Sequence, residues 1–274
     1  MLAAMRRSRT VAAGLAVGLS LLGCGLLPRD VGQSAAPEPT FSVGPEDPSE
    51  TDAAVEDAVP PSVDLDAVFR PSFLTAEGPV DAGSAFLVRW PDGRVLLITA
   101  HHLLGEAGGM SREYTGAELA GVVTGVTASS VDDENLVVAS NTMVALPEAV
   151  SSDVDIRRDL AAFVVADPGA ATVLELAEAP AEPGDRVYLL AETGGPGSKV
   201  FSAIETAKAT TPYLEFAYDE EIDLRTTSGA PLLNSDGQVV GVNIGGDESK
   251  TPVEGHANSI ETFVPMLRKH LGQV

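Results

Sequence analysis

Residues 226–231 read Thr-Thr-Ser-Gly-Ala-Pro, and an alternating apolar stretch, 232–242, follows them directly. Ser228 therefore stands between a glycine turn and a proline that opens a strand. Such a backbone corner exposes the serine hydroxyl, and successive N–H groups beside it can point at a developing oxyanion. The segment predicts a nucleophile turn that leads into a β-strand.

Two upstream segments could supply partners for this serine. Residues 98–102 read Ile-Thr-Ala-His-His and end an apolar strand, and residues 158–163 read Arg-Asp-Leu-Ala-Ala-Phe and open another. A histidine can take the proton of a serine hydroxyl, and an aspartate can orient that histidine. The three candidates occur in the chain order His, Asp, Ser.

Together the three segments resemble the trypsin-like (chymotrypsin-fold) serine peptidases, whose signatures are a TAxH strand end, a DLA strand start and an SGxP turn. The resemblance covers about residues 80–265. It implies an all-β fold of two six-stranded antiparallel β-barrels with a short C-terminal helix. It also implies a serine endopeptidase that forms an acyl-enzyme on Ser228, with His102 as base and Asp159 as its partner. Such an enzyme acts on proteins or peptides and needs no metal or cofactor.

Both upstream partners have rivals close by. The family pattern places the base at His102 and makes His101 the variable neighbour. Asp159 directly precedes the apolar run 160–165, whereas Asp153 and Asp155 suit a solvated acidic loop. A simple strand-entry cap remains an alternative for Asp159.

The position two before the nucleophile departs from the family pattern. The resemblance implies an oxyanion hole made by the backbone N–H groups of Thr226 and Ser228, and glycine usually holds the first position. A β-branched residue resists positive φ, so Thr226 could strain or collapse the hole. A catalytically silent trypsin-like domain that binds a peptide or an envelope protein is therefore the rival interpretation. An esterase-like hydrolase is less favoured, since its serine elbow precedes a helix and a strand follows Ser228.

Positions relative to Ser228 also indicate the substrate-binding residues. Ile222 and Asp223 are expected near the base of the S1 pocket, and strand 241–246 is expected to pair with the substrate backbone. The residues of that strand assigned to substrate binding are Asn243, Ile244 and Gly245. The preference for the P1 side chain stays open: Asp223 would favour a basic one, Ile222 an apolar one and Arg225 an acidic one. His256 is expected in a loop after this strand.

Composition agrees with one β domain and restricts its partners. The chain has 274 residues with 44% hydrophobic and 5% aromatic content, which suits a core packed mainly with aliphatic side chains. Its formal net charge is −23. We expect that the chain does not bind nucleic acids, because its negative charge would repel phosphates instead of neutralising them. A monomer is expected.

The N-terminus indicates export. A basic start precedes an apolar stretch, 10–22, that is too short to span a bilayer. Residues 21–24 read Leu-Leu-Gly-Cys and resemble the bacterial lipobox, which implies that residues 1–23 are a removed signal peptide and that Cys24 is lipidated. We expect a lipoprotein anchored to a membrane of the cell envelope and facing the extracytoplasmic side. An ordinary signal peptide is the alternative. Cys24 is the only cysteine, so no disulfide can form within the chain.

Residues 24–62 are rich in Pro, Glu, Asp, Ser and Ala and predict a disordered acidic tether. The peptidase domain is expected over 63–274, where short apolar runs alternate with turns. A hairpin joins 83–90 to 94–99 through Pro-Asp-Gly, and the two barrels are expected to connect through 180–185. Further strands are predicted over 121–127, 136–139, 160–166, 186–191, 199–208, 214–218, 231–233 and 239–244, and a helix over 262–271.

Overall fold

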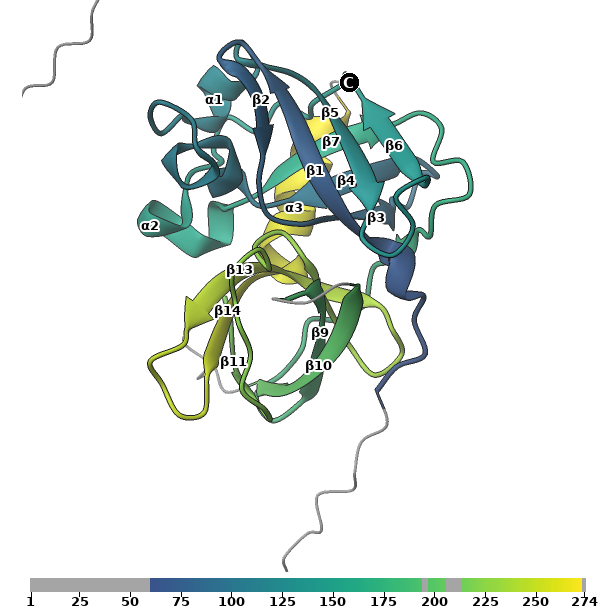
Figure 1. Cartoon of the computed structure of the whole chain (residues 1–274), viewed down its shortest axis with the longest axis vertical. Coiled ribbons are helices and arrows are strands. Elements are labelled where there is room, and N and C mark those ends of the chain that lie inside the picture. The colour runs from purple at the N-terminus through teal and green to yellow at the C-terminus, as the bar shows by residue number, and fades with distance from the viewer. Residues whose placement is uncertain (1–59, 194–196, 206–212, 273–274) are drawn as a thin grey trace, which may run out of the picture. The chain divides into compact units, whose positions relative to one another are not determined.

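The computed structural model describes residues 60–193, 197–205 and 213–272 (Figure 1). The predicted signal peptide, Cys24 and the tether up to residue 59 lie outside this range. Among the described residues, no helix has the length and apolar character needed to cross a bilayer.

The first half of the domain is a curled antiparallel sheet, which occupies the upper part of Figure 1. Six of its strands follow the order β6-β5-β1-β3-β4-β7, while β2 pairs with β1 and β8 pairs with β3. The N–H of Val144 donates to the carbonyl of Ala162 at 2.8 Å, and the N–H of Val164 donates to that of Thr142 at 2.8 Å. These bonds bring the two ends of the sheet together. The strands are β1 (Val68–Thr75), β2 (Gly78–Asp81), β3 (Ala85–Arg89), β4 (Val95–Thr99), β5 (Val123–Ser130), β6 (Val137–Ser140), β7 (Ala161–Val165) and β8 (Leu174–Glu175).

The second half is a closed barrel in the order β10-β11-β14-β13-β12-β9. Figure 1 shows it below the first sheet. In β11 the burial alternates along the strand, with Leu214, Phe216 and Tyr218 inside the barrel. Such alternation is what a strand with one face on a core requires. The strands are β9 (Arg186–Glu192), β10 (Ser198–Glu205), β11 (Leu214–Tyr218), β12 (Pro231–Leu233), β13 (Val239–Asp247) and β14 (Glu254–Ser259).

β13 is apolar on both faces because it lies between two cores. Val240 belongs to the core of the second barrel, whereas Val242 and Ile244 pack with the core of the first sheet. The strand therefore joins the two halves of the domain, next to the turn that carries Ser228.

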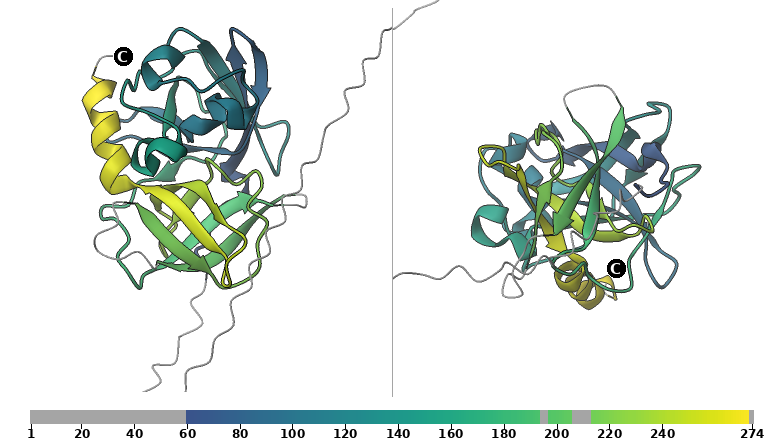
Figure 2. Two further views of the ribbon diagram at one scale, coloured as in Figure 1. Left: turned by 90° about the vertical axis from the view of Figure 1, so that its left-hand side faces the viewer. Right: turned by 90° about the horizontal axis from the view of Figure 1, so that it is seen from below.

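The C-terminal helix α3 (Ile260–Leu271) runs from the second barrel along the side of the first sheet (Figure 2). Ser259 caps it, since its Oγ accepts the N–H of Glu261 at 3.2 Å. Phe263 and Leu267 pack into the first core, and Arg94 Nη1 donates to the carbonyl of Leu271 at 2.8 Å. The helix starts two residues before its predicted position because the capping serine precedes the first apolar residue of the helical face.

Short helices lie in the loops of the first half: η1 (Leu65–Ala67), η2 (His101–Leu104), η3 (Glu106–Gly108), α1 (Gly116–Leu119), α2 (Ser152–Asp155) and η4 (Ile156–Arg158). The predicted all-β fold of two six-stranded antiparallel β-barrels with a short C-terminal helix is confirmed: the second half is a closed six-stranded barrel, and the first is a curled sheet of six strands with β2 and β8 added beside them. Residues 206–208 of one predicted strand lie outside the described range.

Candidate active site

His102 directly follows β4, in the short helix η2, and contacts one carboxylate at two places. Its Nδ1 lies 2.6 Å from Oδ2 of Asp159, and its backbone N–H donates to Oδ1 at 3.0 Å. Asp159 is fully buried and precedes β7, and His102 is 7% exposed. The contact with Nδ1 fixes the tautomer and the orientation of the ring, so Nε2 is the nitrogen available for proton transfer.

Two opposing effects set the pKa of His102. Burial lowers the pKa, because a charged imidazole is poorly solvated there. The hydrogen bond that the carboxylate of Asp159 accepts and the charge of that carboxylate raise it, and the net result is a pKa above the ordinary value of 6.5. The imidazole is neutral, and can accept a proton, when the pH exceeds this raised pKa.

The rivals of these two residues have other partners. His101 Nε2 lies 2.7 Å from the carbonyl of Tyr114, and burial lowers the pKa of this histidine. Asp155 pairs with Arg157 at 2.8 Å in the loop before η4. Asp159 contacts the second barrel as well, since Asn258 Nδ2 donates to its backbone carbonyl at 3.4 Å.

Ser228 lies at the junction of two overlapping turns between the second barrel and the first sheet. The N–H of Thr227 donates to the carbonyl of Leu224 at 3.2 Å, and the N–H of Ala230 donates to that of Thr227 at 3.0 Å. The carbonyl of Ser228 accepts the N–H of Ser84, which precedes β3, at 2.8 Å. The serine is therefore anchored to the same sheet that carries His102.

Two N–H groups of the turn have no hydrogen-bond acceptor among the residues that the structure describes. Within the described parts of the chain, neither Thr226 nor Ser228 donates its backbone N–H, whereas the N–H groups of Arg225, Thr227 and Gly229 are all hydrogen-bonded. Thr226 also has a φ of 70°, the positive value that the sequence made questionable for a β-branched residue. An oxyanion hole needs two N–H donors that are not already hydrogen-bonded within the protein.

The hydroxyl of Ser228 points toward β13. Its Oγ donates to the carbonyl of Ile244 at 2.8 Å, and over the described residues no hydrogen bond joins Ser228 to His102. Rotation about the Cα–Cβ bond would release the hydroxyl from Ile244. Among the described residues, the contact between His102 and Asp159 is thus formed, and the contact between His102 and Ser228 is not.

Of the residues expected at the base of the S1 pocket, Ile222 packs into the core of the second barrel and is 5% exposed. Asp223 accepts the Nε–H of Arg225 at 2.9 Å, and this hydrogen bond lowers the pKa of Asp223 to about 2. Glu248 accepts the N–H of Leu224 at 2.7 Å. The acidic charge of Asp223 is therefore already matched by a neighbouring guanidinium.

The three residues assigned to the substrate-pairing strand have different surroundings. Asn243 is fully buried, and its Nδ2 donates to the carbonyl of Thr227 at 3.0 Å and to Thr227 Oγ1 at 2.9 Å. These hydrogen bonds hold the side chain of Asn243 against the turn that carries Ser228. Ile244 and Gly245 instead line a hollow of about 360 Å³ between the loop around α2 and β13. Its other lining residues are Ser152, Asp153, Ile156, Gly246 and His256.

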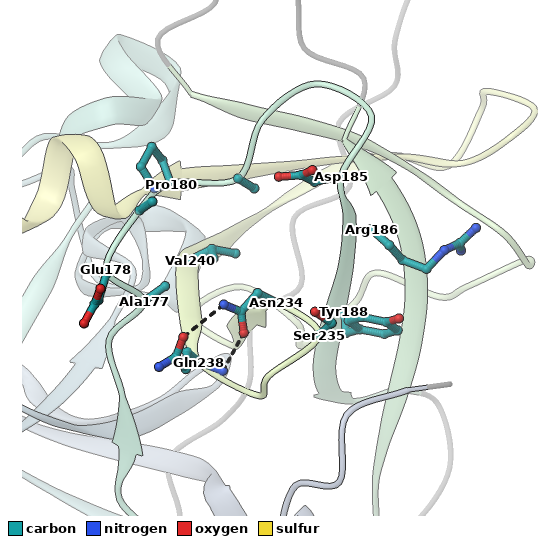
Figure 3. A pocket seen from close by; sticks show the side chains of 12 residues that line it. Ala177, Glu178, Pro180, Asp185, Arg186, Tyr188, Asn234, Ser235, Gln238 and Val240 are labelled. Carbon is teal, nitrogen blue, oxygen red and sulfur yellow. Dashed lines mark hydrogen bonds between the residues drawn. The ribbon is translucent and has the colours of Figure 1, made fainter. Parts of the chain in front are cut away.

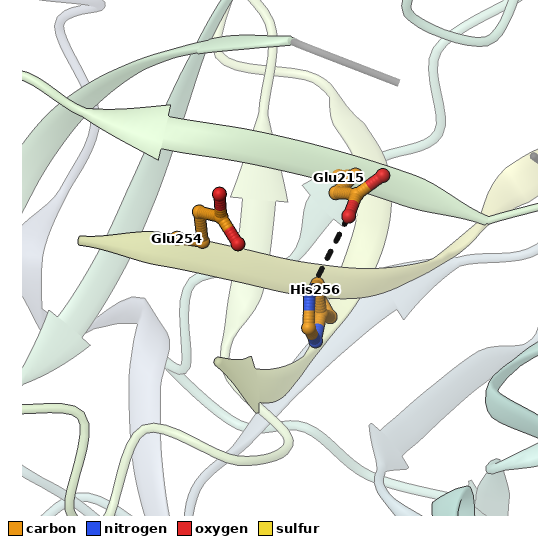
Figure 4. Close-up of side chains that lie close together, drawn as sticks. All are labelled: Glu215, Glu254 and His256. Carbon is orange, nitrogen blue, oxygen red and sulfur yellow. Dashed lines mark ion pairs between the residues drawn. The ribbon is translucent and has the colours of Figure 1, made fainter. Parts of the chain in front are cut away.

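One cluster on the outer face of the second barrel has the chemistry of a metal site. Glu215 and His256 are direct partners on β11 and β14, and Glu254 lies two residues before His256 (Figure 4). The ligand atoms of the three side chains all lie within 4.8 Å of one another. Two carboxylates and an imidazole suit a divalent cation. This cluster is separate from the His102–Asp159 pair, and the reaction proposed below makes no use of it.

A second hollow, of about 480 Å³, lies beside the connection between the two halves (Figure 3). Pro180, Arg186 and Tyr188 line one part of it, and Asn234 and Gln238, which are hydrogen-bonded to each other, line another. None of the predicted site residues lines it. Of the predicted site residues, Ile244 and Gly245 line the other hollow, beside β13.

Two curled antiparallel β-sheets, with a buried histidine–aspartate pair on the first and a serine turn anchored between them, define the chymotrypsin-like class of proteins. The chain belongs to the trypsin-like peptidase domain family, whose model matches residues 83–242. Family and fold support a serine protease.

Solved structures show the same fold at low sequence identity. The serine endoprotease from Yersinia pestis aligns at 16% identity with a TM-score of 0.51, over 75% of this chain and 62% of its own. The present chain thus spans under two thirds of that protein. The Rv3671c protease from M. tuberculosis, in its active form, aligns at 19% identity with a TM-score of 0.51, over 88% of this chain and 94% of its own. A search of curated protein sequences gives no match.

Proposed function

We propose that this protein is a serine endopeptidase that works through Ser228, His102 and Asp159. The observation that carries the proposal is the buried contact between His102 and Asp159, which leaves one imidazole nitrogen available for proton transfer. The two unbonded N–H groups of Thr226 and Ser228 support it, since they can bind the oxyanion. The substrate is a protein or peptide.

In the first half of the reaction Ser228 leaves the carbonyl of Ile244 and attacks the carbonyl carbon of the scissile bond. The bond from Oγ to carbon forms, and the hydroxyl proton passes to Nε2 of His102. The charged imidazole is stabilised by Asp159, and the developing oxyanion accepts the N–H groups of Thr226 and Ser228. The C–N bond then breaks as His102 gives its proton to the leaving amine.

The second half of the reaction hydrolyses the acyl-enzyme. His102 takes a proton from water, the resulting hydroxyl attacks the ester carbon, and the proton returns to Ser228 as the ester bond breaks. Neither half needs a metal ion or a cofactor.

A reaction with a fluorophosphonate probe tests this proposal, because the probe forms a bond only with an activated serine. Full-length protein extracted in mild detergent should be labelled, and Ser228→Ala and His102→Ala should not. Ser235→Ala is the matched control and should be labelled like the wild type, since Ser235 lines the other hollow. Correctly folded wild type that stays unlabelled would overturn the peptidase and leave a domain that binds a peptide or an envelope protein.

The proposal includes export and a lipid anchor at Cys24. This part of the proposal rests on residues 1–24 of the sequence. Mass spectrometry of the N-terminal peptide should find Cys24 as the first residue, carrying acyl chains. Cys24→Ala should release the protein from the membrane fraction. A mature chain that starts elsewhere, or an unmodified Cys24, would contradict the anchor without affecting the catalytic part of the proposal.

A further inference from the structure

Thr226 holds a conformation that its side chain disfavours. It is the third residue of the turn that the N–H of Thr227 closes on the carbonyl of Leu224, and its φ is 70°. A positive φ at the third position is the mark of a type II turn, where glycine or asparagine is usual. For the described residues, Thr226 is the one non-glycine residue with positive φ.

The relaxed alternative would remove an oxyanion donor. Type I and type II turns share their outer residues and differ in the direction of the central peptide. Turning the peptide between Arg225 and Thr226 over would give Thr226 a negative φ, which a β-branched residue prefers. It would also point the N–H of Thr226 to the opposite side of the turn. The strained form is therefore the one that presents both donors.

Two hydroxyl contacts together fix the orientation of Thr226. Ser84 Oγ donates to the carbonyl of Thr226 at 2.8 Å, and Thr226 Oγ1 donates to the carbonyl of Glu192 at 3.3 Å. The carbonyl of Thr226 lies in an outer peptide that both turn types share, whereas the flip would swing the side chain, so the two contacts resist the flip only in combination. Glu192 is tied in turn to the first sheet, because Arg70 Nε donates to its carboxylate at 2.8 Å. Thr226 is thus connected to the first sheet from both sides.

Ser84 is built into the structure more firmly than a surface serine. It is 3% exposed, its N–H donates to the carbonyl of Ser228 at 2.8 Å, and its carbonyl accepts the hydroxyl of Thr99 at 2.7 Å. The preceding residue, Gly83, approaches Ser228 so closely that a Cβ atom there would lie 2.7 Å from the carbonyl of Ser228. Ser84 therefore couples the strand end near His102 to both residues of the oxyanion pair.

We propose that Ser84 is a positioning residue for the oxyanion hole, and that its hydroxyl offsets the strain that threonine brings to position 226. This inference rests on the proposed peptidase function. It predicts that the importance of Ser84 depends on which residue occupies position 226. With glycine at that position the turn presents its donors without help, and the hydroxyl of Ser84 becomes dispensable for the reaction.

A double-mutant cycle on the full-length protein tests the proposal. Ser84→Ala should slow labelling by a fluorophosphonate about fivefold, as expected for the loss of one hydrogen bond. In the Thr226→Gly background the same change should slow it less than twofold. Thr226→Val, which keeps the β-branch and removes the hydroxyl, should also slow labelling. The matched control is Ser130→Ala, because Ser130 is buried, donates to the carbonyl of Asp66 at 3.0 Å and, among the described residues, has no hydrogen bond to Thr226 or Ser228.

The cycle separates a positioning role from a structural one. If Ser84 only contributed to folding, its loss would lower the urea midpoint and the labelling rate by the same factors in both backgrounds, which would overturn the proposal. An unchanged labelling rate in Ser84→Ala would overturn it too.

A measurement without catalysis distinguishes failure of this inference from failure of the peptidase. The nuclear Overhauser effect between the α proton of Arg225 and the amide proton of Thr226 is strong in a type II turn and weak in a type I turn, because the central peptide points in opposite directions in the two. Ser84→Ala should weaken it, and Ser130→Ala should not. A wild type that is not labelled but shows this change would retain the positioning role of Ser84 and refute the peptidase. An unchanged effect in Ser84→Ala would refute the positioning role.

Discussion

One carboxylate fixes both the ring and the backbone of a single histidine: Asp159 Oδ2 lies 2.6 Å from Nδ1 of His102, and Oδ1 accepts the N–H of the same residue at 3.0 Å. Because Asp159 is fully buried, water cannot replace either contact. The position of the imidazole is therefore set by the start of β7 as much as by the end of β4.

Replacing Asp159 with asparagine should lower the labelling rate by about four orders of magnitude, as in other Ser-His-Asp sites where the tautomer is lost. The amide keeps the size of the side chain, but its NH₂ group can turn toward Nδ1 and force the proton to Nε2. Single-turnover labelling measures the effect. Asp155→Asn is the control, since Asp155 pairs with Arg157, and it should leave the rate within a factor of two.

The pH dependence of labelling should report the raised pKa of His102. The base must be neutral to accept the serine proton, so the rate should rise with pH and reach half its maximum above pH 6.5. In Asp159→Asn the contributions of Asp159 are lost, while burial, which lowers the pKa, and the smaller raising contributions of Glu113 and Asp153 remain. The midpoint should then fall relative to the wild type. A midpoint that did not move between the two proteins would show that Asp159 does not set the pKa.

The sequence pattern was sufficient to predict the fold, because apolar alternation and turn residues mark most strands. It missed the short strands β2 and β8, and it missed β1 and β14 for identifiable reasons. Pro71 interrupts β1, and a proline within a run argues against a strand. β14 reads Glu-Gly-His-Ala-Asn-Ser, and its strand pairing comes from the neighbouring strands β11 and β13 instead of from its own apolar residues.

The site could be predicted only in part. Motif spacing indicated the residues that the structure places in contact, His102 and Asp159, and their catalytic roles remain predictions. Ser84 carried no signal, since its contact with Thr226 spans 142 positions of the chain. Nor could alternation reveal that the side chain of Asn243 turns under the serine loop, because polar residues within an apolar strand can face either side.

Gly229 should tolerate no side chain. Its φ is 87°, and an added Cβ would lie 2.1 Å from the carbonyl of Ser84 and 2.5 Å from Thr99 Oγ1. Gly229→Ala should lower the free energy of unfolding by about 2–5 kcal/mol, from the left-handed backbone and the overlap together. Gly93 has a φ of 91° with nothing near its Cβ, so Gly93→Ala should cost only about 1 kcal/mol. Urea unfolding of the two variants compares them, and equal losses would contradict the close packing around Gly229.

The preference for the P1 residue should depend on the pair formed by Asp223 and Arg225. In the structure the pKa of Asp223 is lowered to about 2, so its carboxylate is charged. The guanidinium of Arg225 balances this charge, and the carboxylate therefore does not attract a basic side chain of the substrate. Arg225→Ala should free that charge and raise kcat/KM for peptides with lysine or arginine at P1 about threefold relative to leucine, because Asp223 is partly exposed and an exposed ion pair contributes little free energy. Arg157→Ala removes an exposed arginine from a similar pair with Asp155 and controls for the change in net charge. If Arg225→Ala and Arg157→Ala gave the same P1 profile, Asp223 would lie outside the S1 pocket, and the apolar or acidic preferences predicted from Ile222 and Arg225 would be tested next with the same peptides.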